Sequence, residues 1–403
     1  MTTKPPQQRS KPTWWRSPQR TLLRRALFQI HLWTGIALAL YAIAIGISGS
    51  ALVFKGEIER AAHPSLFHIQ PAQPQTTIEQ TIRRIERERP GWKSFALEDF
   101  EHPDQATSVL LHLPAAASTP NYRIVSFNPY TGETLLDRMR YAGLLGWLDN
   151  LHVYLLSGHT GLLVSGWMGV GLLLLSFTGL VLWWPGVQRW RRALVLSRKA
   201  NWRRLNFDLH TVIGFWVSAT LIIVTFTGVD FAFPDALGPL IELATGGSLS
   251  ARAAAENPPT RLPALSSAPV LTLDQAIAAA YRALPIDAPP GYFSLPSTPN
   301  APFHVTGYYT GAAPFSQLVR ISLDPHTGAL LGSSSTRQQT RAQRIEQYFV
   351  TVHFGSFAGT GWFGILVKVL WVFLGLAPAI LSVTGLIMYW NRKLRGLWLA
   401  FNQ

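Results

Sequence analysis

The chain has 403 residues, of which 48% are hydrophobic and only 14% charged, and this composition excludes an ordinary soluble domain. The formal net charge of +14 lies in short segments rather than along the whole chain, which argues against a nucleic-acid-binding protein. The absence of cysteine excludes iron–sulfur clusters, thiolate zinc sites, disulfides and attachment of a cofactor through cysteine.

Four apolar runs exceed the ~20 residues that a helix needs to cross a bilayer. They cover residues 31–54, 161–184, 210–233 and 362–390. The first run is too long for a signal-peptide core and lacks a cleavage pattern, so we expect it to remain in the mature protein. The sequence therefore predicts a multi-pass protein of the lipid bilayer.

In chain order the sequence predicts four spans joined by two long and one short connection. The segments are a basic tail at 1–25, span one at 26–54, a long connection at 55–150, a histidine segment with span two at 151–185, a basic loop at 186–206, span three at 207–233, a long connection at 234–350, a histidine segment with span four at 351–391, and a tail at 392–403.

The basic residues are distributed unequally over these connections. Residues 1–30, 186–208 and 391–403 together hold 17 basic residues and 1 acidic residue. The two long segments, 55–150 and 229–352, hold 17 basic and 20 acidic residues. Because basic connections remain on the cytoplasmic side, we expect both termini in the cytoplasm and both long connections outside.

Both long connections show the same order of predicted elements, which indicates an internal duplication. Each begins with an amphipathic helix and continues with strands around an Asn/Asp-Pro-x-Thr-Gly turn. The first has a helix at 76–89 and strands at 108–113, 122–127 and 134–136, and the second has a helix at 273–284 and strands at 303–309, 317–323 and 329–331. The fold class is thus a mainly α membrane protein with a four-helix transmembrane bundle and two external α+β modules.

Spans one and three share one histidine pattern. His31 and His210 are each followed by glycines at +4 and +18. The nearer glycines, Gly35 and Gly214, lie one helical turn on and would leave room for a flat macrocycle. A single membrane histidine can simply contact headgroups, but the repeated spacing indicates half of a haem-binding four-helix core.

A second set of histidines precedes spans two and four. His152 and His353 lie shortly before these spans, and each span ends in a Thr-Gly dipeptide. With both termini inside, the histidines sort into one pair on each membrane side. Neutral imidazole is a good iron ligand, so the sequence predicts two haem b groups whose iron is bound by His31 with His210 and by His152 with His353. The alternative is four interfacial histidines satisfied by headgroups or backbone.

Three further residues are candidates near these sites. His159 lies two turns after His152 if the helix is continuous, and it could replace His152 or contact a propionate. Lys368, within span four, could pair with a propionate or extend towards the outside. Asp208 could accept the N–H of His210, or it could be a helix N-cap. We interpret the remaining histidines as surface or structural residues.

These motifs resemble the PepSY-associated transmembrane family of bacterial inner-membrane proteins. The resemblance is carried by H-L-W-T-G at 31–35, D-L-H-x-x-x-G at 208–214, V-H-F-G at 352–355, the Thr-Gly span ends and the two turns. Among its members the chain is similar to the FoxB-type ferric-siderophore reductases, which are di-haem proteins. This resemblance implies two periplasmic PepSY-like modules and reduction of ferric siderophore iron on the periplasmic side.

No dinucleotide-binding, P-loop, metalloprotease or nucleophile-elbow motif is found in the sequence. We therefore expect a separate electron donor, such as a quinol or a cytoplasmic reductase. Two rivals remain: a quinol or general cytochrome b oxidoreductase with another acceptor, and a non-redox membrane anchor whose external modules inhibit a partner.

Overall fold

The computed structural model describes residues 21–99, 102–113, 122–197, 201–246, 269–311, 317–359, 361–395 and 398. The chain divides into a helical unit (residues 1–50, 164–232 and 372–403) and a sheet unit (residues 51–163 and 233–371). Residues 1–20 of the predicted N-terminal tail, 198–200 of the predicted basic loop and most of 396–403 in the predicted C-terminal tail lie outside the described residues.

Four helices among the described residues are long and apolar enough to cross a membrane, as predicted. They are α1 (Leu22–Leu52), α5 (Gly158–Trp183), the continuous stretch of α6 (Trp202–Asp208), a π turn (Leu209–Ile213) and α7 (Gly214–Ala232), and α12 (Trp362–Tyr389), which ends in a second π turn (Trp390–Leu394). A helix suits lipid because it satisfies its backbone hydrogen bonds internally.

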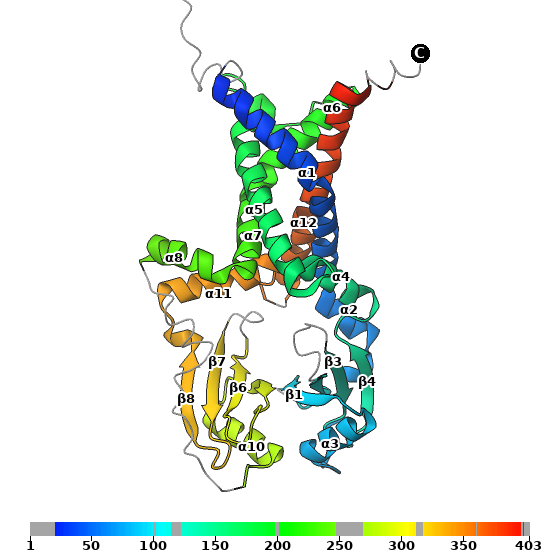
Figure 1. The fold of residues 1–403 in the computed structure, drawn as a ribbon, viewed down its shortest axis with the longest axis vertical. Helices are drawn as coiled ribbons and strands as arrows, with labels where there is room; N and C mark the ends of the chain where they lie inside the picture. Colours follow the sequence, from blue (N-terminus) through cyan, green and yellow to red (C-terminus); the bar gives the residue numbers. More distant parts are fainter. Residues whose placement is uncertain are drawn as a thin grey trace, which may run out of the picture. The chain divides into compact units, whose positions relative to one another are not determined.

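Within the helical unit, α1 contacts both α5 and α12 (Figure 1). Near its C-terminal end, a Cβ added to Gly46 would lie 2.9 Å from the Gly375 carbonyl oxygen, and the Ser50 hydroxyl donates to the Val372 carbonyl (3.0 Å). Such close approach of two backbones requires small residues at the helix interface. Nearer its N-terminal end, α1 contacts α5, where the Tyr41 hydroxyl donates to the Ser165 carbonyl (3.0 Å).

The sheet unit contains, within its described residues, one eight-stranded antiparallel sheet (Figure 1). The strand order is β4-β3-β2-β1-β5-β6-β7-β8. The strands are β1 (Lys93–Glu98), β2 (Thr107–His112), β3 (Arg123–Phe127), β4 (Thr134–Met139), β5 (Pro290–Ser294), β6 (Phe303–Tyr308), β7 (Leu318–Leu323) and β8 (Leu330–Ser335). The sequence predicted the outer three strands of each half and missed β1 and β5.

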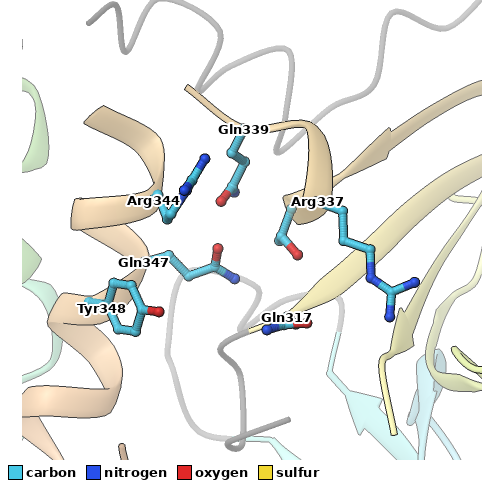
Figure 2. Close-up of a pocket in the computed structure, with 7 residues that line it drawn as sticks. Gln317, Arg337, Gln339, Arg344, Gln347 and Tyr348 are labelled. Carbon is cyan, nitrogen blue, oxygen red and sulfur yellow. The ribbon is translucent and has the colours of Figure 1, made fainter. Parts of the chain in front are cut away.

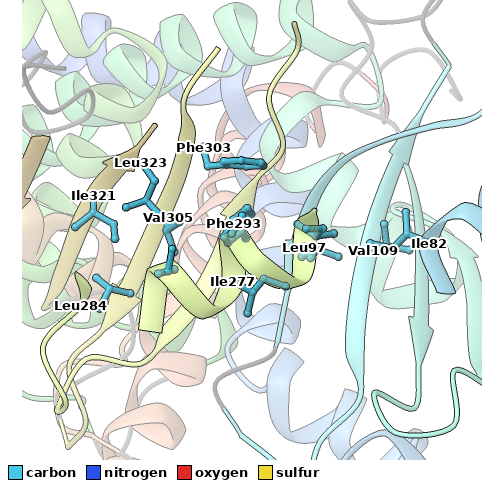
Figure 3. Close-up of a cluster of buried hydrophobic side chains, with 14 of the residues drawn as sticks. Ile82, Leu97, Val109, Ile277, Leu284, Phe293, Phe303, Val305, Ile321 and Leu323 are labelled. Carbon is cyan, nitrogen blue, oxygen red and sulfur yellow. The ribbon is translucent and has the colours of Figure 1, made fainter. Parts of the chain in front are cut away.

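Strands β1 and β5 join the two halves at the centre of the sheet. Leu97 pairs with Phe293, and Glu98 pairs with Tyr292. The helices α3 (Ile78–Glu88) and α10 (Leu273–Ala283) precede β1 and β5, and their apolar faces pack on one shared core. Figure 3 shows this core with side chains from both halves, including Ile82 and Ile277. The two long connections thus contribute four strands each to one sheet.

The N-termini of α3 and α10 are capped by each other's acidic residues. The Asp274 carboxylate accepts the N–H groups of Ile78 (3.0 Å) and Glu79 (3.1 Å), and the Glu79 carboxylate accepts the N–H of Leu273 (2.9 Å). A carboxylate stabilises a helix N-terminus because it satisfies free N–H groups and opposes the helix dipole. The two halves are therefore tied together at the helices as well as at the strands.

The described residues of the sheet unit also include the shorter helices α2 (Lys55–Ala62), α4 (Gly143–Tyr154), α8 (Pro234–Thr245) and α11 (Arg341–His353). Helix α8 packs on α11, where Ile241 contacts Ala342 and Phe349. Helices α4 and α11 each end shortly before a membrane-spanning helix and position the second pair of histidines.

Candidate functional site

The first histidine pair, His31 and His210, lies inside the helical unit, and we call it the span pair. His31 is on α1, and His210 is in the π turn that connects α6 to α7. Their ring centroids are 6.4 Å apart, and the ring planes are nearly perpendicular at 88°. Single π turns within α-helices are often found at functional sites. The structure thus brings together the two histidines that share the predicted glycine spacing.

Each ring of the span pair is bound by a threonine of a neighbouring span. His31 Nδ1 lies 2.9 Å from Thr178 Oγ1 on α5, and His210 Nδ1 lies 3.0 Å from Thr384 Oγ1 on α12. These threonines belong to the Thr-Gly dipeptides that the sequence marked only as span ends. The occurrence of one dipeptide in both halves was the signal that could have assigned them to the site.

The glycine that follows each threonine lets the imidazole approach the helix. A Cβ added to Gly179 would lie 3.1 Å from His31 Cε1, and one added to Gly385 would lie 3.3 Å from His210 Cε1. Both distances are tighter than ordinary contact, so an alanine would displace the ring.

Gly35 and Gly214 are less closely packed than Gly179 and Gly385. A Cβ at Gly35 would lie 3.7 Å from Leu175, and one at Gly214 would lie 3.6 Å from Leu381. Both are ordinary van der Waals distances, so helix packing alone does not require glycine at either position. Their predicted role beside a flat macrocycle stays a prediction.

The second pair, His152 and His353, belongs to the sheet unit, and we call it the sheet-unit pair. Their ring centroids are 6.2 Å apart, with an angle of 64° between the planes. His152 lies in the last turn of α4, and His353 is the last residue of α11. The sequence placed both shortly before spans two and four, and the structure places them on separate helices that precede α5 and α12.

The helix is not continuous between His152 and His159. Helix α4 ends at Tyr154, the next two residues, Leu155 and Leu156, have positive φ angles of 45° and 61°, and α5 begins at Gly158. This break makes His159 an exposed residue in the first turn of α5, on a different helix from His152. The ring that lies against His353 is that of His152.

Local contacts fix the helix ends that carry the sheet-unit pair. Asp149 on α4 pairs with Lys55 (2.9 Å) and with Arg140 (3.5 Å). The ring of Tyr141 lies 6.1 Å from that of Tyr154, and burial raises the pKa of Tyr141 to about 12. The phenol of Tyr141 therefore remains neutral at physiological pH.

The end of α11 is held from the following span. The Trp371 indole N–H donates to the Val352 carbonyl (2.8 Å), next to His353. Gly355 has a φ of +66°, and a Cβ there would lie 2.5 Å from the Trp371 ring. Glycine is needed at this position both for the backbone conformation and for the close approach.

Two predicted site residues have other partners. Asp208 is buried, pairs with Arg204 (2.8 Å) and accepts the Ser197 N–H (3.2 Å), while the bond to His210 Nδ1 is made by Thr384. Lys368 pairs with the Glu57 carboxylate on α2, and its possible contact with a propionate stays a prediction. Arg204 and Asp208 are four residues apart on one helix, a spacing that could have revealed this pair, whereas Glu57 is 311 residues from Lys368 in the sequence.

The other described histidines agree with the structural interpretation where contacts are present. His304 Nδ1 bonds to the Ser322 hydroxyl (2.9 Å), and burial lowers the pKa of His304. His326 Nε2 bonds to Asn300 (3.0 Å). In the part of the chain that the structure describes, no group of three or more His, Cys, Asp or Glu could hold a metal ion. A site made of two histidines has fewer residues than such a group and so falls outside this finding.

A polar cavity of about 340 Å³ lies along α11 in the sheet unit (Figure 2). Its lining residues are Gln317, Thr336, Arg337, Gln339, Arg344, Gln347 and Tyr348. The Arg337 guanidinium is bound elsewhere, to Asp287 (2.8 Å) and over the Tyr309 ring, which leaves the exposed Arg344 as the main source of positive charge. The buried amide oxygen of Gln339 has no hydrogen-bond partner among the described residues.

Comparison with known proteins gives a family and one relative. The family described as the PepSY-associated TM region matches residues 28–392, a range that includes all four paired histidines. An uncharacterized protein of Pseudomonas aeruginosa is 29% identical over 264 residues, which cover 61% of this chain and 63% of that protein. The match thus covers less than two thirds of the relative, whose name states no activity.

Proposed function

Because the chain belongs to the PepSY-associated transmembrane family, we propose that it is a di-haem b-type cytochrome of the bacterial inner membrane. In this proposal it passes electrons across the membrane and reduces ferric siderophore iron on the periplasmic side. The observation that carries the proposal is the presence of two imidazole pairs with nearly equal ring separations, 6.4 and 6.2 Å.

The two separations fit a metal held between two imidazoles. An iron bound to one nitrogen of each ring at about 2 Å separates the ring centres by about 6 Å. The span pair and the sheet-unit pair have this separation on different helices and at different ring angles. His31 with His210, and His152 with His353, would hold one haem b each. Bound haem would supply one-electron oxidation and reduction.

The chain's own residues would orient these ligands. Thr178 and Thr384 bind the Nδ1 atoms of the span pair, and the glycines after them allow the rings to lie close to the helices. In the sheet-unit pair, the bond from Trp371 to Val352 fixes the end of α11 next to His353. Apolar spans around the first pair exclude water, and this favours neutral imidazole.

The charge distribution supports a periplasmic location of the sheet unit, where the proposed acceptor would be reduced. The basic short connections predict cytoplasmic termini and a periplasmic sheet unit. The absence of a nucleotide-binding motif in the sequence supports a separate donor, a quinol or a cytoplasmic reductase. Ferrous iron binds hard oxygen ligands more weakly than ferric iron does, so reduction at the periplasmic face would release iron from a siderophore.

The polar cavity on α11 is a candidate site for this acceptor. Tyr348 in its lining precedes His353 by five residues on the same helix, which is about 7.5 Å along the axis. Arg344 and the side-chain amides offer donors to the oxygen atoms of a ferric chelate. We also propose that the two sheet halves are PepSY-like modules related by duplication, as the symmetric strand order supports.

The test is a pyridine-haemochrome measurement and a visible spectrum on the purified full-length protein. Two haem b per chain, with sharp bands of the reduced bis-imidazole form, are expected. Addition of a ferric siderophore to the reduced protein should reoxidise the bands. A protein without haem would overturn the proposal and favour the non-redox anchor. Haem without siderophore reduction would favour a cytochrome b with another acceptor.

A further inference from the structure

We propose that Thr178 and Thr384 are positioning residues that fix the tautomer of the span pair, with the proton on Nδ1 and the lone pair on Nε2. The assignment of the tautomer rests on hydrogen bonds alone. Its consequence for a metal rests on the proposed haem function, so the two can fail separately.

The argument begins with the single hydrogen of a threonine hydroxyl. Thr178 Oγ1 lies 2.6 Å from the Leu174 carbonyl oxygen and 3.2 Å from that of Leu175. A carbonyl oxygen can only accept, so the short contact uses the hydroxyl hydrogen. Only lone pairs of Oγ1 are then left for His31 Nδ1 at 2.9 Å, and that nitrogen must carry the proton.

The second half of the helical unit repeats this arrangement with other residues. Thr384 Oγ1 lies 2.7 Å from the Ile380 carbonyl oxygen and 3.1 Å from that of Leu381. His210 Nδ1 lies 3.0 Å from the same hydroxyl oxygen. By the same argument His210 donates through Nδ1, so its Nε2 is also the bare nitrogen.

This tautomer has a chemical consequence. A neutral imidazole binds a metal through its unprotonated nitrogen, and its other N–H usually donates to an oxygen that holds the ring and raises its basicity. The threonines supply that oxygen from within apolar spans, without a carboxylate. A more basic imidazole favours ferric over ferrous iron, so both threonines should lower the midpoint potential of the haem at the span pair.

Gly179 and Gly385 complete the arrangement. Each His ring touches the glycine next to its threonine, and so the helix surface limits ring rotation while the hydroxyl fixes Nδ1. Removal of the hydroxyl oxygen alone, with the side-chain shape retained, therefore isolates the electronic effect from the packing effect.

The experiment uses Thr178→Val and Thr384→Val, which keep the branched shape, and Thr178→Ser and Thr384→Ser, which restore the hydroxyl. The control is Thr211→Val, next to His210, whose hydroxyl donates to the Phe207 carbonyl (2.9 Å). Redox titration of the full-length protein, followed by haem absorbance, should show an upward shift for one haem in the valine variants. Retention of that haem should fall about 10- to 100-fold. The serine variants should restore both values.

The sheet-unit pair is an internal reference, and its haem should keep its potential in every variant. An unchanged potential and retention of the span-pair haem in both valine variants would overturn the proposal. So would an equal shift in Thr211→Val.

If the purified wild type contains no haem, the proposed function fails, but the tautomer is still measurable. The ¹⁵N spectrum of histidine-labelled full-length protein should then show two Nδ1–H imidazoles that are lost in the double valine variant. The same spectrum in the double variant and in the wild type would overturn the tautomer assignment.

Discussion

The span pair and the sheet-unit pair have almost the same ring separation on very different supports. His31 and His210 lie on long apolar helices and are bound by threonines of neighbouring spans. His152 and His353 lie at the ends of two short helices that are attached to the sheet unit. The helices around the two pairs pack differently, so the separation of the imidazole rings is the property that the two sites share. This is expected if one kind of ligand is bound at both.

The largest effect is expected when each of the four paired histidines is replaced in turn. His31→Ala or His210→Ala should remove one of two haems and leave about half of the pyridine-haemochrome signal, because a low-spin haem needs both axial ligands. His152→Ala or His353→Ala should remove the other haem. His159→Ala is the matched control and should retain both. Full haem content in all four paired variants would refute the assignment.

A smaller effect is expected from Gly385→Ala, which should affect the span pair only. The added Cβ would lie 3.3 Å from His210 Cε1, so the ring must move by a few tenths of an ångström. We expect roughly tenfold weaker retention of one haem. Gly361→Ala is a control on the same chain segment, because a Cβ there meets nothing within 4 Å. Equal haem loss in both variants would indicate general damage to α12.

Arg344→Gln should affect the sheet unit alone. An exposed charged contact contributes about 1 kcal/mol, so the KM for an anionic ferric chelate should rise roughly fivefold. Haem content should be unchanged, since Arg344 lies nine residues before His353. The exposed Arg282 on α10 offers a control variant, Arg282→Gln. An unchanged KM in Arg344→Gln would show that the acceptor does not bind in the α11 cavity.

The smallest expected effect is a pH dependence of the sheet unit. Burial lowers the pKa of His304 from its ordinary value of 6.5, so the unfolded state takes up this proton at a higher pH than the folded state does. The contribution of His304 to stability is therefore constant above pH 6.5 and falls as the pH drops below that value. Thermal unfolding followed between pH 8 and pH 5 should show a weaker pH dependence in His304→Gln. An identical pH profile in the wild type and in His304→Gln would show that His304 is not the source of the pH dependence.

Patterns within short stretches were sufficient to predict much of this fold. Long apolar runs predicted the four spans, and short apolar runs around the two Asn/Asp-Pro-x-Thr-Gly turns predicted β2, β3, β4, β6, β7 and β8. Strand β5 was missed because Pro290-Gly291 indicates a turn, and β1 was missed because its residues, KSFALE, include Lys, Ala and Glu, which are uncommon in strands. Both strands depend on pairing with each other across the chain, which a local pattern does not contain.

The candidate site, like the fold, was predicted in part: its histidines were selected from the sequence, but most of their surroundings were not. Repeated spacing was enough to select four histidines that the structure brings together in two pairs, although their role as iron ligands stays a prediction. The ion pair between Lys368 and Glu57 was not predicted because it joins residues far apart in the sequence, whereas the i,i+4 pair of Arg204 with Asp208 was overlooked. The sequence left open whether the helix continues from His152 to His159, because the break depends on positive φ angles at Leu155 and Leu156 that leucine rarely takes.

The pairing of β1 with β5 also imposes an order on biosynthesis. Leu97 cannot meet Phe293 until two further membrane-spanning helices, α5 and α6–α7, have been made and the second long connection has followed. During that interval β1 pairs with β2 on one side only, and its other edge is open to aggregation or to binding by a chaperone. Closure of the sheet is thus a late step in assembly, and a chain truncated after span three should be degraded even though the first half of its sheet is complete.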